Sequence, residues 1–539
     1  MAIEEQTSSE PTAPAHDARA RPRDVAWQQW LAYLLMGLGG WIVAQAWLDP
    51  RYYPLAWPGM MLMFAFTIDQ TPRTAFRRAL VFGTVGILTA FSWVPEVISQ
   101  TLELSYVTSV SLFLVFAVWD GFQFGLTCYF ARRASRWSRD WVILYPVFWV
   151  AFEYVWPRIF PWRMGHSQLA WTSLIQFAEF TGVYGVSFLV IWVTAIGGVL
   201  LRQLVWKEAD HATRRRIPRL EIGLALTACV AALGFGTWRI GNIEAIAAGN
   251  EPVRVALVQA NVFEADAHAT LQRLSADIAV NVDLVCWPET SVGVYSEALR
   301  DFRSEESLRT HSRTEDAVLR PWATPGCALL CAGKSYAPDV PDKGPYYVTA
   351  FLIDAEENIL GSYHKRTLLP LGEYVPGEQW LPQLAELALL DKRISKGTSA
   401  QLLELPGKAK IGTLICYEDM VAQNARQSTR EGAELLVALI NGAAFGETLA
   451  MPQHQQLAFY RAIENRRYLL RCSSTGTTSV ISPVGKVVAQ LPPHTATALA
   501  ATVYPMNTMT VYTRLGDVFS YGCIAVAVLT MVLCWRTAR

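Results

Sequence analysis

Three residues in the second half of the sequence suit nucleophilic acyl transfer. Glu289, Lys365 and Cys416 each stand just after an apolar, strand-like stretch. A cysteine attacks a carbonyl carbon as its thiolate, so it needs a neighbouring base, and a carboxylate can serve as one. The tetrahedral intermediate carries a negative oxygen, which an ammonium group stabilises. These residue types predict Cys416 as nucleophile, Glu289 as general base and Lys365 as stabilising cation, acting through a thioester.

The positions of these residues also suit a site. A side chain at the carboxyl end of a buried strand is held rigidly while its functional group faces a cleft. We therefore expect the three side chains to converge at one edge of a sheet. Taken alone, Glu289 resembles a solvated strand-end carboxylate, Lys365 a surface cation and Cys416 a small buried residue. The three ordered motifs together favour the catalytic interpretation.

The sequence around these residues resembles a known family. The motifs Trp-Pro-Glu at 287–289, His-Lys-Arg at 364–366 and Cys-Tyr-Glu-Asp at 416–419 are similar in order and spacing to the Glu-Lys-Cys triad of the nitrilase superfamily. The form with Gly-Glu-Tyr-Val-Pro at 372–376 resembles the membrane-bound branch of that superfamily, the apolipoprotein N-acyltransferases. This resemblance implies that Glu373 is a second active-site carboxylate.

The resemblance also implies a reaction and a fold. A fatty acyl chain is expected to move from a phospholipid to Cys416, and then to the α-amino group of the N-terminal diacylglyceryl-cysteine of a lipoprotein. Tyr417 and Glu418 match further functional positions of the family. The implied fold is a polytopic α-helical membrane domain plus an α/β nitrilase-like α-β-β-α sandwich. No metal or other cofactor is implied, and we expect a monomer. A formal net charge of zero gives no reason to expect a nucleic-acid partner.

The composition indicates that the chain combines a membrane-embedded part with a water-exposed part. Hydrophobic residues make up 52% of the 539 residues and charged residues 17%, which is too apolar for an ordinary soluble enzyme and too charged for a pure membrane bundle. Residues 1–25 have almost no large apolar side chains, so we predict a disordered cytoplasmic tail. Apolar segments of about 20 residues, the length that spans a membrane, follow. We place them near 28–48, 54–70, 79–98, 107–130, 141–156, 175–200, 220–239 and 517–535.

Basic residues alternate between the loops that connect these segments. With the N-terminus inside, the loops predicted outside carry only Arg51, Arg158 and Arg163 before the large domain, and the inside loops carry many more. The tendency of Lys and Arg to stay on the cytoplasmic side therefore predicts a membrane domain of seven helices over 26–245. A periplasmic catalytic domain over 250–505 and a closing transmembrane helix over 515–537 follow. In a bacterium with two membranes, the helices lie in the inner membrane.

One loop of the membrane part has an unusual composition. Residues 156–168 combine Trp, Arg and His, and an aromatic belt with snorkelling arginines is their ordinary interpretation. Phe160, Pro161 and Trp162, with Gly-His-Ser-Gln at 165–168, resemble the membrane part of the same family, where this loop borders the cleft that admits lipid. These three residues are therefore candidates for substrate binding.

The external domain shows short apolar strands separated by helical stretches. Such alternation predicts a sheet core flanked by helices, about 250 residues long. Helices are expected near 266–280, 420–432 and 452–467. Strands are expected at Val253–Gln259, Leu284–Trp287, Ala328–Ala332, Tyr347–Ile353, Ile411–Cys416, Leu435–Ile440, Tyr468–Cys472, Thr478–Ser482 and Ala498–Val503.

Four other cysteines fall in these strand-like runs, in a compartment predicted to be oxidising. Their apolar surroundings favour buried free thiols, although disulfides among them stay open. They are Cys286, Cys327, Cys331 and Cys472.

The chain departs from the family pattern at several positions near the predicted cleft. Gly442 and Ala444 replace an Asp and a Trp, which removes a large aromatic wall, and Leu371 and Ile159 also differ. These changes leave the triad intact but leave acyl-chain and acceptor selectivity undetermined. The polar, charged segment 296–326 permits a mobile lid.

Two alternatives remain. One is a membrane-tethered amidase or nitrilase, in which water resolves the thioester. The other is a non-catalytic membrane scaffold with a degenerate pocket. The intact triad argues against the scaffold, and the membrane motifs argue against a small soluble substrate.

Overall fold

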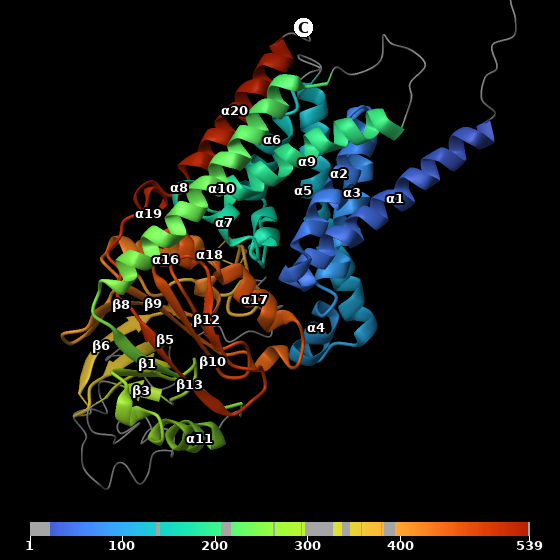
Figure 1. The fold of residues 1–539 in the computed structure, drawn as a ribbon. Coiled ribbons are helices and arrows are strands. Elements are labelled where there is room, and N and C mark those ends of the chain that lie inside the picture. Colours follow the sequence, from blue (N-terminus) through green and yellow to red (C-terminus); the bar gives the residue numbers. More distant parts are fainter. Residues whose placement is uncertain are drawn as a thin grey trace, which may run out of the picture.

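The computed structural model describes most of the chain (Figure 1). Most of the predicted tail over 1–25, and residues 297–326 of the predicted lid, lie outside the described residues. The described ranges are 22–135, 141–205, 217–261, 265–292, 294–296, 327–336, 345–356, 358–378, 380–381 and 394–536.

Helices occupy every place where a membrane segment is predicted. They form one body above the sheets in Figure 1. Short elements connect them, namely η1 (Pro50–Leu55), η2 (Met164–Gln168), α7 (Thr172–Ile175) and α8 (Ala178–Thr181). The longer helices are α1 (Pro22–Leu48), α2 (Ala56–Thr67), α3 (Pro72–Ala90), α4 (Val94–Leu102), α5 (Tyr106–Ala134), α6 (Leu144–Val155), α9 (Val183–Val205), α10 (Arg219–Ala248) and α20 (Val518–Arg536).

Fewer of these helices are long enough to cross a membrane than the eight segments predicted from the sequence. Among the described residues, five helices are long and apolar enough to cross a membrane, and the bent pair α3 and α4 raises the number to six. Helices α2 and α6 have 12 residues each. At 1.5 Å per residue each is about 18 Å long, shorter than a hydrocarbon core of about 30 Å. Apolar composition located these two segments but overestimated their helical length.

The bend between α3 and α4 measures 61° and has a local cause. Pro95 has no N–H to donate to the carbonyl of Phe91 and its ring would clash with that carbonyl, so α3 cannot continue through it. The chain turns over residues 91–93, and Pro95 lies in the first turn of α4. The carbonyl of Ala90, at the broken end of α3, accepts a hydrogen bond from Gln453 Nε2 at 2.7 Å. A side chain from the second half of the chain thus satisfies a carbonyl of the interrupted helix.

Two sheets form the second half of the molecule. The first has the order β13-β1-β2-β4-β5-β6, with β3 paired to β4, and the second has the order β12-β11-β10-β9-β8-β7. Strands of the first sheet are β1 (Val253–Gln259), β2 (Leu284–Cys286), β3 (Val294–Ser296), β4 (Ala328–Tyr336), β5 (Tyr346–Ile353), β6 (Ile359–His364) and β13 (Thr497–Val503). Strands of the second are β7 (Leu403–Leu405), β8 (Ala409–Ile415), β9 (Leu435–Ile440), β10 (Tyr468–Ser473), β11 (Ser479–Ile481) and β12 (Val487–Gln490).

The sheets face each other across a buried apolar core. Side chains such as Leu257, Leu330, Ile411 and Leu470 contribute to it from both sheets. Helix α11 (Ala265–Ala276) covers the outer face of the first sheet, and the helices α16 (Ala422–Arg430), α17 (Ala450–Ala458) and α18 (Tyr460–Asn465) cover that of the second. This arrangement confirms the predicted α-β-β-α sandwich.

Two helices join the sandwich to the membrane helices (Figure 1). Helix α10 leads into β1, and α19 (Val511–Leu515) precedes α20. The apolar segment predicted near 220–239 lies within α10, and the helix continues beyond it to Ala248. Ile243 and Ala247 pack into the core between the sheets, which favours helix beyond the apolar run.

The cysteines of the sandwich are free thiols in the structure. Cys286, Cys327, Cys331 and Cys472 are buried, and none of them is paired in a disulfide. Burial raises the pKa of each of these thiols. A raised pKa keeps a thiol protonated and poorly nucleophilic.

Candidate active site

The structure brings Glu289, Lys365 and Glu373 into one cluster. Lys365 Nζ lies 3.3 Å from Glu289 Oε1 and 2.5 Å from Glu373 Oε1. The Lys365 side chain is 1% exposed, so its ammonium is held by carboxylates rather than by water. A buried ammonium in this setting is a fixed positive charge, suited to a developing oxyanion.

The expectation that these side chains meet at one edge of a sheet is wrong in one respect. Glu289 and Lys365 follow β2 and β6 of the first sheet, whereas Cys416 follows β8 of the second. The site therefore lies between the two sheets, where strand ends from both meet. Each of the three residues does follow the end of a strand, as predicted, but the sequence did not show which strands belong to the same sheet.

Cys416 lies at an unusual turn of the backbone. It begins the short helix η4 (Cys416–Asp419) directly after β8, and its φ of +51° lies in the left-handed region. A non-glycine residue persists there only when the surrounding structure fixes it, and such residues cluster at active sites. The turn leaves the cysteine half-buried rather than inside the core.

Glu418 fixes this turn from one side. Its Oε2 accepts hydrogen bonds from Ile415 N at 2.9 Å and from the Tyr363 hydroxyl at 2.8 Å. Its Oε1 accepts from the backbone N–H groups of Arg366 at 2.7 Å and Thr367 at 2.9 Å. This fully buried carboxylate therefore joins the Lys365 segment to the Cys416 turn.

Asp419 fixes the same turn from the other side. Asp419 Oδ1 lies 2.6 Å from His454 Nε2, and its Oδ2 accepts a hydrogen bond from Arg471 Nε at 2.9 Å. Sequence reasoning gave His454 no role and did not single out Asp419 or Arg471. The two acidic residues of the Cys-Tyr-Glu-Asp motif could be recognised in the sequence, but nothing in the sequence predicted that Asp419 pairs with His454 and Arg471.

Charges around the site set its protonation. Burial raises the pKa of the Cys416 thiol well above its usual value, and Glu289 adds to this while Lys365 opposes it. Burial by itself would lower the pKa of Lys365, but Glu289, Cys416 and Glu373 together raise it. The resting site is therefore a neutral thiol beside a charged ammonium, and the thiol needs a base to react.

The backbone after β9 also reaches the general-base candidate. Asn441 N donates to Glu289 Oε2 at 3.2 Å, and Asn441 Nδ2 donates to Thr290 Oγ1 at 3.1 Å. Ala444, which departs from the family pattern, is exposed, whereas the neighbouring Phe445 lines the pocket beside Cys416.

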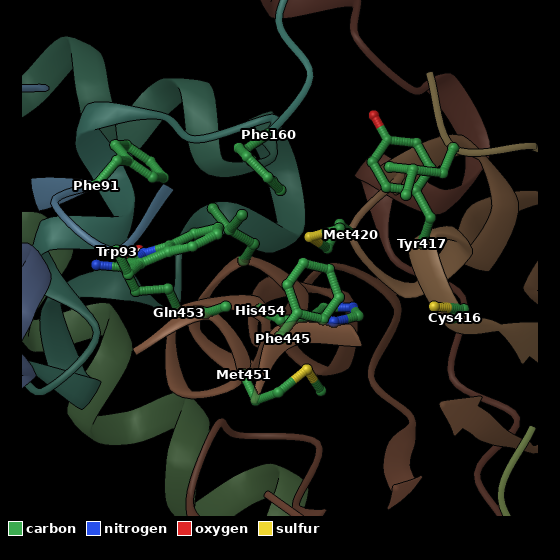
Figure 2. Close-up of a pocket in the computed structure, with 13 residues that line it drawn as sticks. Phe91, Trp93, Phe160, Cys416, Tyr417, Met420, Phe445, Met451, Gln453 and His454 are labelled. Atoms are coloured by element: carbon green, nitrogen blue, oxygen red, sulfur yellow. The ribbon is translucent and has the colours of Figure 1, made fainter. Parts of the chain in front are cut away.

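Cys416 lies on the wall of an apolar pocket shared by the sandwich and the membrane helices (Figure 2). Phe91, Trp93 and Phe160 come from the membrane side. The free space is about 30 Å³, room for one or two water molecules, so a larger group enters only if side chains move. The sandwich contributes Leu369, Cys416, Tyr417, Met420, Phe445, Ala450, Met451, Gln453, His454 and Leu457.

The candidates in the 156–168 loop are placed differently from one another. Phe160 stacks on Phe91 with ring centroids 5.8 Å apart and lines the Cys416 pocket. Trp162 faces a second cavity, which shares Phe91 with the first, and donates a hydrogen bond to Asp120 at 2.8 Å. Pro161, between them, is half-buried.

Tyr417 connects this loop to the nucleophile turn. Its hydroxyl donates to the carbonyl of Ile159 at 2.8 Å, and its ring lines the pocket. The residue after Cys416 therefore ties the sandwich to the membrane-side loop. Among the described residues, no three His, Cys, Asp or Glu side chains cluster as metal ligands.

Comparison with known proteins defines the class. Residues 254–509 match the carbon-nitrogen hydrolase family, and residues 39–196 match the apolipoprotein N-acyltransferase N-terminal domain. The protein is thus a membrane-helix domain joined to a nitrilase-like enzyme domain.

Relatives along the whole chain narrow this class. The apolipoprotein N-acyltransferase of Geobacter metallireducens is 30% identical over 521 residues, which cover 94% of this chain and 95% of that one. The Methylococcus capsulatus protein of the same name is 28% identical and covers 91% and 94%. The chain belongs to the apolipoprotein N-acyltransferase family. The solved structure of Nit3 from Saccharomyces cerevisiae, with 20% identity, a TM-score of 0.33 and coverage of 47% and 91%, is a more distant likeness.

Proposed function

We propose that the protein transfers a fatty acyl chain from a membrane phospholipid to the α-amino group of the N-terminal diacylglyceryl-cysteine of a lipoprotein. The observation that carries this proposal is the position of Cys416. Cys416 lines an apolar pocket bounded by membrane helices, and its thiol interacts electrostatically with the polar cluster of Lys365 and two carboxylates. The same cysteine is thus near groups suited to acyl transfer and near a pocket suited to an acyl chain.

The first half-reaction forms a thioester. Glu289 takes the thiol proton of Cys416, and the sulfur attacks the ester carbonyl of the phospholipid. Lys365 stabilises the oxyanion of the tetrahedral intermediate. The ester C–O bond then breaks, Glu289 returns the proton to the leaving oxygen, and a lysophospholipid departs. Glu373 holds Lys365 in place while this happens.

The second half-reaction transfers the acyl group to nitrogen. The neutral α-amino group of the diacylated acceptor attacks the thioester carbonyl, again forming an oxyanion beside Lys365. Glu289 takes a proton from the attacking nitrogen, the C–S bond breaks, and the proton passes to the sulfur of Cys416. The product is an amide on a triacylated lipoprotein. Apolar walls exclude water, which would otherwise hydrolyse the thioester.

The apolar pocket suits the acyl chain, although it must open to admit one. Met420 and Met451 line it, and their unbranched side chains adapt readily to irregular shapes. Phe160, Pro161 and Trp162 belong to the loop that we propose borders the lipid path. Tyr417 and Glu418 support the nucleophile turn.

We further propose the orientation in the membrane. The distribution of basic loops supports a cytoplasmic N-terminus and tail 1–25, helices of 26–245 and 515–537 in the bacterial inner membrane, and a periplasmic domain of 250–505. Helices α2 and α6 are too short to cross the membrane by themselves. A topology of eight passes that includes them therefore requires flanking non-helical residues or a locally thinned bilayer. We propose a monomer.

The experiment is an assay with two defined substrates. Purified protein in detergent is incubated with a phospholipid and a synthetic diacylated lipopeptide that has a free N-terminal cysteine amine. Mass spectrometry of the peptide is expected to show the gain of one acyl group and, in parallel, lysophospholipid. Free fatty acid with an unmodified peptide supports the hydrolase instead. No turnover of either substrate supports the scaffold.

A further inference from the structure

A hollow lies at the far end of the membrane helices, away from Cys416. Helix α4 packs against η5 (Ala443–Phe445) of the sandwich and against α5. The Pro72 end of α3 and the Ala134 end of α5 therefore point away from the sandwich (Figure 1). Between these two ends is an open space of about 350 Å³, lined by Arg73, Phe76, Arg77, Leu126, Tyr129 and Phe130.

The two arginines of this hollow lack protein counter-charges. Arg73 and Arg77 lie one helical turn apart on α3, and both are exposed. Neither forms a hydrogen bond or ion pair with another of the described residues. Like charges four residues apart on a helix repel each other, so the pair favours an anion from outside the chain.

Some neighbouring arginines at the same end behave differently. Arg78 donates to the carbonyl of Phe66 at 2.8 Å, and Arg132 donates to that of Gln70 at 2.8 Å. Arg202 pairs with Asp69 at 2.8 Å. Arg133, Arg219 and Arg536 also form no side-chain hydrogen bond or ion pair with another described residue. What distinguishes Arg73 and Arg77 is therefore that they lie one helical turn apart and line the same hollow.

The rest of the lining is apolar and aromatic. Phe76 packs edge-on against Phe122 with centroids 5.6 Å apart, and Tyr129 packs against Phe130 at 5.2 Å. Guanidinium groups bind phosphate oxygens through two parallel N–H donors, and aromatic rings favour the boundary between lipid headgroups and hydrocarbon. The two arginines thus suit the phosphate of a phospholipid headgroup, and the aromatic lining suits the adjoining start of its acyl chains.

We propose that this hollow binds the headgroup of a phospholipid with net negative charge. Such a headgroup supplies the missing counter-charge, whereas a zwitterionic headgroup brings a cation of its own. Arg73 and Arg77 lie 18 and 14 residues before Phe91, so about 21–27 Å of chain along α3 separates the hollow from the break at Phe91, which lines the Cys416 pocket. The bound lipid is therefore not the acyl donor, and the proposal does not depend on the proposed reaction.

The test measures retained lipid by native mass spectrometry of the full chain in detergent. The probes are phosphatidylglycerol and, for comparison, phosphatidylcholine with the same acyl chains. Each basic residue contributes about 1 kcal/mol to binding of anionic lipid, so R73Q/R77Q is expected to bind phosphatidylglycerol about 30-fold more weakly than the wild type. The matched control R219Q/R536Q removes two exposed arginines from the ends of α10 and α20 and is expected to change binding by less than twofold.

Several results would overturn the proposal. These are equal retention of both lipids by the wild type, equal loss in both double variants, or displacement of the lipid by inorganic phosphate alone. If R73Q/R77Q does not fold, R73K/R77K replaces it, because lysine keeps both charges without the forked donors. That variant is expected to bind phosphatidylglycerol twofold to tenfold more weakly, and unchanged binding contradicts the proposal.

Discussion

The two walls of the Cys416 pocket are built in different ways. On the sandwich side, buried carboxylates hold the nucleophile turn, with four hydrogen bonds to Glu418 and two partners on Asp419. On the membrane side, the wall is aromatic, and Trp93 is fixed by a hydrogen bond from its indole N–H to Gln453 Oε1 at 2.8 Å. Reactive geometry is thus set by buried hydrogen bonds, and the shape available to the substrate is set by packing.

This difference between the two walls predicts different effects for substitutions on the two sides of the pocket. Buried, charged hydrogen bonds cannot be lost without leaving groups unpaired, so substitutions on the sandwich side should lower turnover. Aromatic packing can rearrange at lower cost, so substitutions on the membrane side should change which acyl chain is used.

The largest effect is expected for Lys365. The K365M variant keeps a side chain of similar length but removes the charge beside the oxyanion, and loss of one such donor lowers turnover about 10²–10³-fold. The rate of Cys416 acylation measures this. The control K408M alters a partly exposed lysine paired with Asp283 and should change the rate by less than twofold. Acylation of K365M within fivefold of the wild type would contradict the assigned role.

A somewhat smaller effect is expected for Glu418. In E418Q the amide nitrogen faces N–H or O–H donors, so at least one of the four hydrogen bonds is lost, at a cost of about 2–3 kcal/mol. If this cost falls on the geometry of the nucleophile turn, turnover drops about 100-fold. The control E434Q alters a carboxylate that accepts from Lys410 N at 2.8 Å at the far end of β8. Equal effects of E418Q and E434Q would remove the argument for positioning.

Asp419 gives a prediction about pH. Burial would raise the pKa of Asp419, but His454 and Arg471 lower it below the usual value. Its stabilising contribution is therefore complete above about pH 4, the pKa of an unfolded aspartate, and is lost as the pH falls through the lower folded pKa. D419N should thus unfold at a lower temperature than the wild type at pH 7, by several degrees, and the gap should narrow toward pH 3.

The measurement for Asp419 is the midpoint of thermal unfolding across this pH range. The matched control D354N alters an aspartate of an exposed turn that follows β5. A gap between D419N and the wild type that stays constant with pH would contradict the ion-pair account.

The smallest effect is expected on the membrane side. W93A enlarges the pocket, and each methylene group that becomes buried contributes about 0.8 kcal/mol, or about fourfold. The preference for a heptadecanoyl over a palmitoyl donor, which differ by one methylene group, should rise by about that factor, with little change in total turnover. Competition between the two donors measures it. The control W238A removes an exposed tryptophan on α10, and the same shift there would assign the effect to the bilayer instead.

The sequence located the candidate groups better than it predicted the contacts that hold them. Glu289, Lys365 and Cys416 follow strands, so a local pattern located them, and the structure gathers Lys365 with both carboxylates. The bonds of Glu418 to Arg366 and Thr367 join two sheets. No local pattern specifies such a pairing, because it depends on how the strands are ordered.

Other features that the sequence did not predict also depend on contacts between distant parts of the chain. Gln453 reaches Ala90 and Trp93 across 363 and 360 residues, and this contact explains how the helix break is held against the sandwich. The extension of α10 to Ala248 depends on core contacts made only after the sandwich forms. Periodicity and apolar length report local preference, whereas these features come from tertiary packing.

The most direct test of the account is the intact mass of the protein after incubation with phospholipid alone. The account predicts that the wild type gains the mass of one fatty acyl chain, that hydroxylamine removes it, and that C416A gains nothing. Addition of the diacylated peptide should then discharge the adduct onto the peptide amine. An acyl adduct of equal yield on C416A, or no adduct on a wild type that still acylates the peptide, would contradict a Cys416 thioester.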